Sequence, residues 1–220
     1  MSDLKRSKEM KIGIIGAGNI GSTVAKLFVD AGHQVAISNS RGPETLDKLA
    51  SELGDNAEAS TVENAIDFGD VVLISIPLKN HTGLPTNGWE NKVVIDSNNY
   101  YPDRDGQIGD LDSGKTTSSE LLEKHLPGAR IVKGFNTIWS EHLKTVGNKS
   151  LPLEERRAIF IAGDDSGAKE IVAKLIESIG FAAVDTGFLA EGGRSQQPGS
   201  AIYNKELSGK EAAKALSADA

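Results

Sequence analysis

The chain has 220 residues, of which 38% are hydrophobic, and its 24 basic and 31 acidic side chains give a formal net charge of −7. This length is enough for one large domain or two small ones, and the acidic balance argues against a nucleic-acid partner because no basic stripe offsets it. Cysteine is absent, so disulfide bonds and thiolate metal sites are excluded.

Residues 1–9 are charged and lack an apolar segment, so they are predicted to be a loose leader and not a signal peptide. A single cofactor-binding domain is predicted over residues 10–220, of which 190–220 form a C-terminal tail. No apolar run in the sequence approaches the ~20 residues that a membrane span needs. We therefore predict a cytoplasmic protein with no membrane partner.

The central motif of the chain is residues 11–21, Lys-Ile-Gly-Ile-Ile-Gly-Ala-Gly-Asn-Ile-Gly. An apolar run at 12–15 predicts a strand, and apolar residues that recur at helical spacing over 20–31 predict a helix. The glycines of a G-x-G-x-x-G pattern therefore fall between a strand and a helix, and this context is what makes the pattern a dinucleotide-binding signal.

Each glycine of the motif has its own expected role. Gly16 permits the tight turn, Gly18 lets a pyrophosphate approach the backbone, and Gly21 lets the helix pack close to the strand. Asn19 and Ile20 begin the helix, whose unpaired N–H groups and partial positive charge suit a phosphate. These five residues are predicted to bind the cofactor.

A second strand is predicted at 34–38, and its tip decides between NAD and NADP. An NAD site usually has Asp or Glu there to hold the ribose hydroxyls. This tip instead has hydroxyls, an amide and a guanidinium, which favour the 2′-phosphate of NADP because they can donate to it. The predicted phosphate-binding residues are Ser38, Asn39, Ser40 and Arg41.

The rest of the chain alternates between strands and helices. Strands are predicted at 57–59, 71–75, 93–96, 129–135, 158–162 and 182–185. Helices are predicted at 46–53, 61–68, 119–125 and 165–179. Residues 97–118 lack periodicity and are predicted to be a long functional loop. This alternation predicts an α/β fold, a doubly wound parallel sheet of the Rossmann type with an extra C-terminal strand–helix–strand and a polar tail.

Few side chains are suited to acid–base chemistry. The four histidines show no metal-ligand spacing, so no metal site is predicted. His81 alone follows a strand end at which ligands bind, namely Ser75-Ile76-Pro77. The Tyr-x-x-x-Lys pair of short-chain dehydrogenases does not occur. Hydride transfer between two ring cofactors requires alignment more than proton transfer by a side chain, and this sequence is compatible with that demand.

Over residues 10–190 the chain resembles the F420-dependent NADP reductase family, also called NADPH:F420 oxidoreductases. The resemblance rests on the glycine loop, on Ser40-Arg41, on Ile76-Pro77, on Asn136-Thr137-Ile138 and on a run of matched positions over 163–189. It implies that Ser38, Ser40 and Arg41 hold the 2′-phosphate and that Ile76 and Pro77 lie near the nicotinamide. It also implies that residues 135–138 line the pocket where nicotinamide and acceptor rings stack.

The expected activity is hydride transfer between NADP(H) and a flat ring such as coenzyme F420 or a flavin. The candidate acceptor pocket comprises Ile76, Pro77, His81, Tyr100, Phe135, Asn136 and Ile138, with Thr137 on the cofactor side. Two alternatives stay open: a reductase of a small imine or keto acid resembling pyrroline-5-carboxylate reductase, and a non-catalytic NADP-sensing module. No second arginine is evident to hold a carboxylate substrate.

Three further expectations concern the tail and the chemistry. The protein is predicted to be a homodimer. Its tail, over 189–203, is expected to be too polar to add to the core and to close the acceptor pocket. Because Asn136 cannot carry a proton at neutral pH, the proton is expected to come from solvent, and the rate of hydride transfer should vary little between about pH 6 and 8, where a histidine would titrate.

Overall fold

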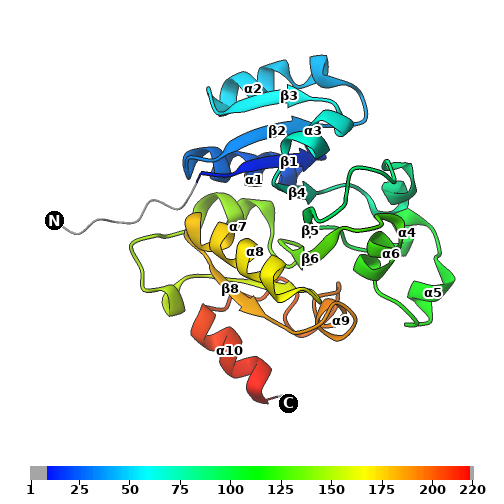
Figure 1. The fold of residues 1–220 in the computed structure, drawn as a ribbon. Coiled ribbons are helices and arrows are strands. Elements are labelled where there is room, and N and C mark those ends of the chain that lie inside the picture. Colours follow the sequence, from blue (N-terminus) through cyan, green and yellow to red (C-terminus); the bar gives the residue numbers. More distant parts are fainter. Residues whose placement is uncertain (1–8, 219–220) are drawn as a thin grey trace.

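A computed structural model describes residues 9–218, so the predicted leader lies outside the described residues except for its last residue. The described part of the chain forms one eight-stranded sheet in the order β3-β2-β1-β4-β5-β6-β7-β8, running from β3 at the top of Figure 1 towards β8 near the bottom. The strands are β1 (Lys11–Ile15), β2 (Gln34–Ser38), β3 (Ala57–Ser60), β4 (Val71–Ile74), β5 (Val93–Asp96), β6 (Arg130–Gly134), β7 (Ala158–Ala162) and β8 (Ala182–Asp185).

Helices cover both faces of the sheet (Figure 1). They are α1 (Asn19–Asp30), α2 (Asp47–Leu53), α3 (Val62–Phe68), α4 (Pro102–Asp105), α5 (Gly109–Asp112), α6 (Ser118–His125), α7 (Ser140–Thr145), α8 (Ser166–Ser178), α9 (Glu191–Ser195) and α10 (Gly209–Ala218). Three short 3₁₀ helices connect them, η1 (Pro43–Thr45), η2 (Leu78–Gly83) and η3 (Leu153–Glu155). The α/β class and the Rossmann-type sheet predicted from the sequence are confirmed.

The central strands are buried on both faces, as their unbroken apolar runs predict. Within β4, Leu73 packs with α1 and α8 residues on one face, whereas Val72 and Ile74 pack with Trp89 and with Leu122 of α6 on the other. Successive side chains of a strand point to opposite faces, so each central strand contributes to two hydrophobic clusters at once. This double burial holds the sheet between its two helical layers.

The sheet changes direction at β7, which the sequence did not predict. β1 to β6 are parallel, but β7 pairs antiparallel with β6, with Gly134 opposite Ile161. The chain between them passes through α7, which packs against α1, and so returns without crossing the sheet. β8 then pairs parallel with β7 after the α8 connection. An aspartate caps α8: the Asp165 side chain accepts from the backbone N–H of Ala168 at 2.7 Å.

The predicted polar tail is folded onto the end of the sheet, and the expectation that it adds nothing to the core is wrong. Ile202 and Ala212 are buried in a cluster with Phe160 and Val184, the latter two from β7 and β8. Gln196 is fully buried. Helix α8 packs on one face of β7 and β8, and the tail covers the opposite face of these strands. An apolar strand face at the end of a sheet must be buried against another element.

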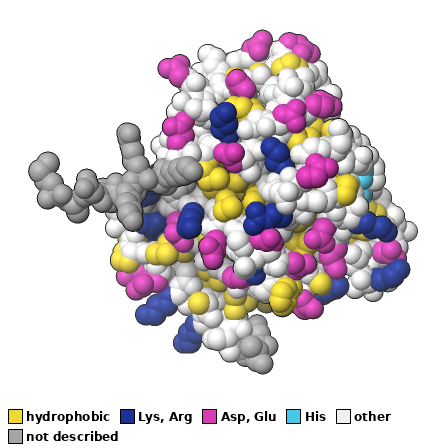
Figure 2. Space-filling view, viewed as in Figure 1, with side chains coloured by type: hydrophobic (Ala, Val, Ile, Leu, Met, Phe, Trp, Pro, Cys, Tyr) yellow, Lys and Arg dark blue, Asp and Glu magenta, His cyan; other side chains and the backbone are white. Residues whose placement is uncertain are grey.

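The surface agrees with the composition. Figure 2 shows basic and acidic side chains interspersed on one face of the molecule. Within residues 9–218, no helix is both long and apolar enough to span a bilayer.

Candidate functional site

Two glycines of the loop after β1 are fixed by packing. Gly16 has a φ of 108°, and a Cβ there would lie 2.0 Å from the carbonyl oxygen of Ser75. A Cβ on Gly21 would lie 1.8 Å from the carbonyl oxygen of Gly16. Real Cβ atoms do not approach backbone that closely, so both positions require glycine for the close approach of α1 to the sheet.

Gly18 differs from its two neighbours in the motif. It is exposed, it has an ordinary φ of −79°, and a Cβ there would meet no protein atom within 4 Å. It is also the N-cap of α1, where no side chain caps the helix. The open space in front of this helix N-terminus, with its unpaired N–H groups, fits the pyrophosphate of a dinucleotide. At Gly18 the absence of a side chain therefore leaves room for a ligand, whereas at Gly16 and Gly21 it leaves room for the protein's own backbone.

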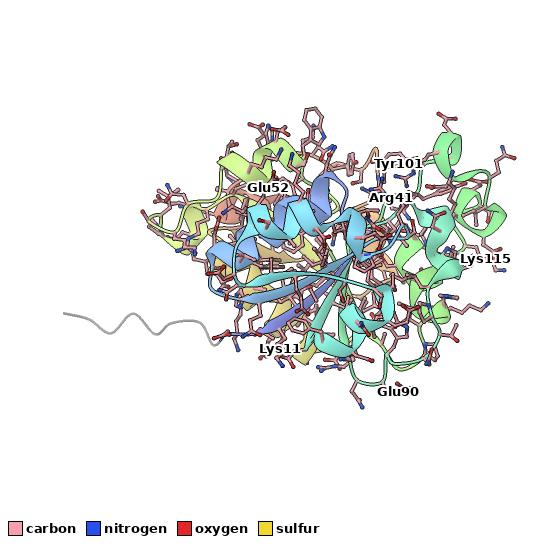
Figure 3. All side chains as sticks on the ribbon, turned by 90° about the horizontal axis from the view of Figure 1, so that it is seen from above. Lys11, Arg41, Glu52, Glu90, Tyr101 and Lys115 are labelled. Atoms are coloured by element: carbon pink, nitrogen blue, oxygen red, sulfur yellow. The ribbon has the colours of Figure 1, made fainter. Side chains whose placement is uncertain are left out.

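At the tip of β2, the Ser38 hydroxyl is buried in the fold, whereas the residues that follow form an exposed polar loop. Ser38 is fully buried and donates to the carbonyl oxygen of Ile14 at 3.0 Å, so its proton is not available to a phosphate. Asn39 shapes the loop, because its Oδ1 accepts from the backbone N–H of Arg41 at 2.8 Å. The side chains of Ser40 and Arg41 are exposed. Figure 3 shows Arg41 on the side of the molecule away from Lys11, where β1 begins.

A cavity of about 490 Å³ lies beside the glycine loop, at the carboxyl ends of β4, β5 and β6. Ligands of open α/β sheets bind at this edge. Nine of the sequence-predicted site residues line it: Gly18, Asn19, Ile20, Ser75, Ile76, Pro77, Phe135, Asn136 and Ile138. Nine further residues that the sequence did not single out complete the wall: Ser97, Asn98, Asn99, Tyr101, Arg104, Trp139, Ser140, Tyr203 and Asn204.

Two candidate acceptor residues lie outside this cavity lining. The Tyr100 hydroxyl donates to Asp112 at 2.7 Å and accepts from the backbone N–H of Ile108 at 2.9 Å, so it holds the loop after β5 together. The Nδ1 atom of His81 lies 2.8 Å from the carbonyl oxygen of Leu78. Neither side chain is among those that surround the cavity. Thr137, predicted on the cofactor side, is also not part of the lining.

Phe135 occupies a strained backbone position at the end of β6. Its φ is 63°, its side chain is fully buried, and its ring packs edge-on against Phe28 of α1 with centroids 6.3 Å apart. A bulky residue with this φ is an outlier that costs about 1–3 kcal/mol and that tends to occur at functional sites. The packing of the ring maintains the turn, which directs the following residue, Asn136, towards the cavity.

An amide network organises the cavity wall. Asn99 and Asn136 pair with each other: Asn99 Nδ2 donates to the Asn136 carbonyl oxygen at 2.8 Å, and Asn136 Nδ2 donates to Asn99 Oδ1 at 3.1 Å. Asn136 Nδ2 also donates to the Gln196 carbonyl oxygen at 2.8 Å, which ties the tail to β6. Within the described chain, the buried atoms Asn98 Nδ2, Asn136 Oδ1 and Asn204 Oδ1 have no partner. A buried polar atom without a hydrogen bond costs about 1–3 kcal/mol, and a ligand with complementary groups would offset that free energy.

A buried ion pair lies behind this wall. Lys133 and Asp96 are both fully buried, and Lys133 Nζ lies 3.7 Å from Asp96 Oδ2. The ammonium donates to the Asn98 carbonyl oxygen at 3.1 Å and to Ser119 Oγ at 3.0 Å. Burial lowers the pKa of Lys133, and the nearby Asp96 carboxylate opposes that shift. The pair anchors Asn98, whose Oδ1 in turn accepts from the backbone N–H of Ile76 at 2.9 Å.

Two tyrosines and an arginine form another wall. The hydroxyls of Tyr101 and Tyr203 are hydrogen-bonded to each other across 102 positions of sequence. The Arg104 guanidinium lies over the Tyr101 ring, 4.8 Å from its centroid, and donates to the Asn99 carbonyl oxygen at 2.7 Å and to Asp105 at 2.8 Å. Arg104 is a second arginine at the site, where the sequence had shown none to hold a carboxylate substrate. The buried carboxylate of Asp105 nevertheless balances its charge.

The missed residues had a partial signal in the sequence. Tyr101 and Arg104 fall in the aperiodic segment 97–118 that was predicted to be a functional loop, but nothing local distinguishes Tyr101 from Tyr100. Tyr203 lies in the segment expected to close the pocket. Trp139 follows the matched stretch 136–138, and it is 61% exposed at the cavity. Residues 9–218 contain no group of three or more His, Asp or Glu side chains arranged to hold a metal ion.

Comparison with known families and structures gives a consistent result. Residues 11–100 match the sequence model of a family described as NADP oxidoreductase coenzyme F420-dependent. A hypothetical protein from Sinorhizobium meliloti has a similar structure, with a TM-score of 0.77, 34% identity and coverage of 90% of this chain and 95% of that one. A structure from Arthrobacter sp. FB24 described as an F420-dependent NADP-reductase shares the fold, with a TM-score of 0.68, 23% identity and coverage of 84% and 88%.

Curated proteins with similar sequences are longer. Metalloreductase STEAP3 of Rattus norvegicus is 25% identical over 182 residues, which cover 82% of this chain and 34% of that protein. Metalloreductase STEAP2 of Mus musculus is 26% identical over 204 residues, which cover 86% of this chain and 36% of that protein. The chain therefore spans about a third of the length of the curated relatives it matches.

Proposed function

Because the chain belongs to the family of NADP oxidoreductases described as coenzyme F420-dependent, we propose that it transfers a hydride between NADP(H) and a flat ring acceptor such as coenzyme F420 or a flavin. The observation that carries this proposal is the cavity that continues from the open space at Gly18 to the ends of β4, β5 and β6. A dinucleotide that binds at Gly18 would extend its nicotinamide into that cavity, as in other open α/β sheets.

The lining supports a flat acceptor. Apolar side chains of Ile76, Pro77 and Trp139 offer faces for two stacked rings, and the asparagine amides offer hydrogen bonds at the ring edges. Alignment of two rings between such faces brings the donor and acceptor carbons together, which is the main contribution that hydride transfer needs from the protein.

Oxidation of NADPH, followed at 340 nm, tests the proposal with a panel of F420, FMN, FAD, a quinone and a ferric chelate. The ferric chelate is included because the curated relatives are named metalloreductases. We expect turnover with a deazaflavin or flavin. Activity confined to a small imine or keto acid would support the pyrroline-5-carboxylate reductase alternative instead, and no NADPH consumption with any acceptor would support a sensing module.

We propose that Arg41 reads the 2′-phosphate. In Arg41→Ala, loss of charge-assisted hydrogen bonds of about 1.5–3 kcal/mol should weaken NADPH binding about ten- to a hundredfold. NADH binding should hardly change, because NADH lacks the phosphate. Dissociation constants for both nucleotides, measured by calorimetry, distinguish these effects. Equal weakening of both would show that Arg41 does not discriminate between them.

Trp139 is proposed as the stacking surface for the acceptor ring. It is the largest exposed apolar side chain at the cavity, whereas the other tryptophan, Trp89, is fully buried. Titration of the acceptor into NADP⁺-loaded protein should quench the Trp139 fluorescence. Loss of stacking worth ~1–3 kcal/mol should weaken acceptor binding about tenfold in Trp139→Ala. Trp139→Phe, which keeps an aromatic face, should recover most of the affinity, and unchanged binding in the alanine variant would contradict the role.

We also propose that the protein is a homodimer and that the tail closes the acceptor pocket. Support for the tail comes from Tyr203 and Asn204, which contribute to the cavity wall, and from the backbone N–H of Asn204, which donates to the Thr137 carbonyl oxygen at 3.1 Å. Sedimentation equilibrium measures the oligomeric state, and a monomer at micromolar concentration would refute the dimer.

A further inference from the structure

One wall of the cavity holds the only side chains in the described lining that can release a proton. Among the lining residues of the described chain, the ionisable groups are those of Tyr101, Arg104 and Tyr203, and an arginine does not deprotonate in a protein. We propose that Tyr101 is the catalytic acid that gives the acceptor its proton, and that Tyr203 and Arg104 position it and stabilise its phenolate. This inference rests on the proposed function.

The contact between the two phenols leaves one proton free. Each phenol has one O–H donor, and the single bond between Tyr101 and Tyr203 uses one of the two protons. The other proton has no partner in that pair and belongs to a group that lines the cavity. A ligand atom that accepts a hydrogen bond can therefore receive it directly.

The surroundings assign the free proton to Tyr101. The Arg104 guanidinium lies over the Tyr101 ring, 4.8 Å from its centroid, where it can stabilise negative charge that develops on this phenol during proton transfer. Burial raises the pKa of Tyr203, and its hydrogen bond with Tyr101 raises it further. Tyr203 therefore keeps its proton and donates it to the Tyr101 oxygen, which leaves the Tyr101 proton for the ligand.

The other charged groups near the pair do not compete for this role. Asp105 accepts from the backbone N–H of Tyr101 at 3.0 Å and binds the Arg104 guanidinium, so its carboxylate is occupied away from the phenol. Lys79 Nζ donates to the Arg104 carbonyl oxygen at 3.0 Å. Both residues hold the segment around Arg104, which fixes the guanidinium over the ring.

The acceptor receives a hydride and then a proton. The acceptor ring gains a hydride, two electrons and one hydrogen nucleus, from the reduced nicotinamide, which becomes oxidised. A ring nitrogen or carbonyl oxygen of the acceptor then carries excess electron density and takes a proton as the Tyr101 O–H bond breaks. The remaining phenolate keeps the hydrogen bond from Tyr203, and a proton from water restores the phenol. The expected proton source thus moves from bulk solvent to a residue of the cavity wall.

The pH dependence follows from the acid role. A phenol is protonated between about pH 6 and 8, so turnover should be flat there. Turnover should fall at alkaline pH, because a catalytic acid must hold its proton. Tyr203→Phe removes the hydrogen-bond donor to the Tyr101 oxygen, so kcat should fall in that variant while NADPH affinity stays unchanged.

The experiment measures turnover of the full chain with NADPH and the ring acceptor across this pH range. In Tyr203→Phe, kcat should fall while NADPH affinity stays within twofold, because the Tyr101 oxygen loses its hydrogen-bond donor. In Tyr101→Phe, kcat with the ring acceptor should fall about a hundredfold, the alkaline fall should disappear, and NADPH affinity should stay within twofold.

The outcomes separate the two proposals. A kcat of Tyr101→Phe within twofold of the wild type, or an unchanged kcat in Tyr203→Phe, would overturn the catalytic acid while leaving the ring acceptor intact. Wild-type protein that oxidises NADPH with no ring acceptor would instead overturn the proposed function. Circular dichroism and melting temperature establish that each phenylalanine variant is folded.

Discussion

Replacement of Gly18 by valine is expected to abolish binding of NADPH and leave the fold intact. A Cβ at this position meets no protein atom within 4 Å, and the backbone φ of −79° suits any residue. The side chain would therefore project into the space where the pyrophosphate approaches the N-terminus of α1. Loss of two or more charge-assisted hydrogen bonds of ~1.5–3 kcal/mol each should weaken binding about a hundredfold or more.

Calorimetric titration with NADPH and with NADH measures this loss, which should be equal for both because they share the pyrophosphate. This equality distinguishes Gly18→Val from Arg41→Ala. Gly21→Ala is the structural control: its Cβ would lie 1.8 Å from the Gly16 carbonyl oxygen, so its melting temperature should fall. Native NADPH affinity in folded Gly18→Val protein would refute the assignment of the glycine loop as the cofactor site.

Replacement of Lys133 by methionine is expected to destabilise the protein by about 3–5 kcal/mol, because it leaves the fully buried Asp96 carboxylate without its cation. For a domain of this size the melting temperature should fall by roughly 10 °C. Chemical denaturation measures the free energy of unfolding. The effect should extend to the cavity, since Lys133 holds the Asn98 carbonyl oxygen and Asn98 holds the backbone of Ile76.

Two further variants isolate the ion pair. Asp96→Asn combined with Lys133→Met removes both charges and should recover much of the lost stability. Lys48→Met, at a side chain that is 89% exposed, should change stability by less than about 0.5 kcal/mol. Destabilisation in the double variant equal to the sum of the two single changes would show that the two charges do not interact.

The pH dependence of stability gives an independent check on Lys133. Burial lowers the pKa of Lys133 in the folded state below its unfolded value. The unfolded chain then binds more protons at this group, so its contribution to stability rises with pH between the lowered folded pKa and the unfolded value near 10.4. The difference in stability between the wild type and Lys133→Met should grow across that alkaline window, and a constant difference would contradict the assigned shift.

The sequence by itself determined the elements whose signals lie in neighbouring residues. The apolar runs of β1, β4 and β5, the helical spacing in α1 and α8 and the aspartate that caps α8 all depend on local periodicity or on contacts within a few residues. The polar tip of β2 and the glycine loop are equally local. These features were sufficient for the α/β class and for the Rossmann-type sheet, and the cofactor roles of the glycine loop stay a prediction.

Only the tertiary structure decided which distant residues meet. Tyr101 and Tyr203 touch across 102 positions, and Lys133 reaches Asp96 and Asn98 from a neighbouring strand. The direction of β7 depends on its pairing with the exposed edge of β6. The packing of the tail depends on the apolar face of β7 and β8 that α8 does not cover. Such contacts result from the burial of surfaces that are far apart in the chain, so no periodic pattern within one segment encodes them. The chemistry of the cavity wall therefore emerges from the fold, while the position of the cofactor loop can be predicted from the sequence.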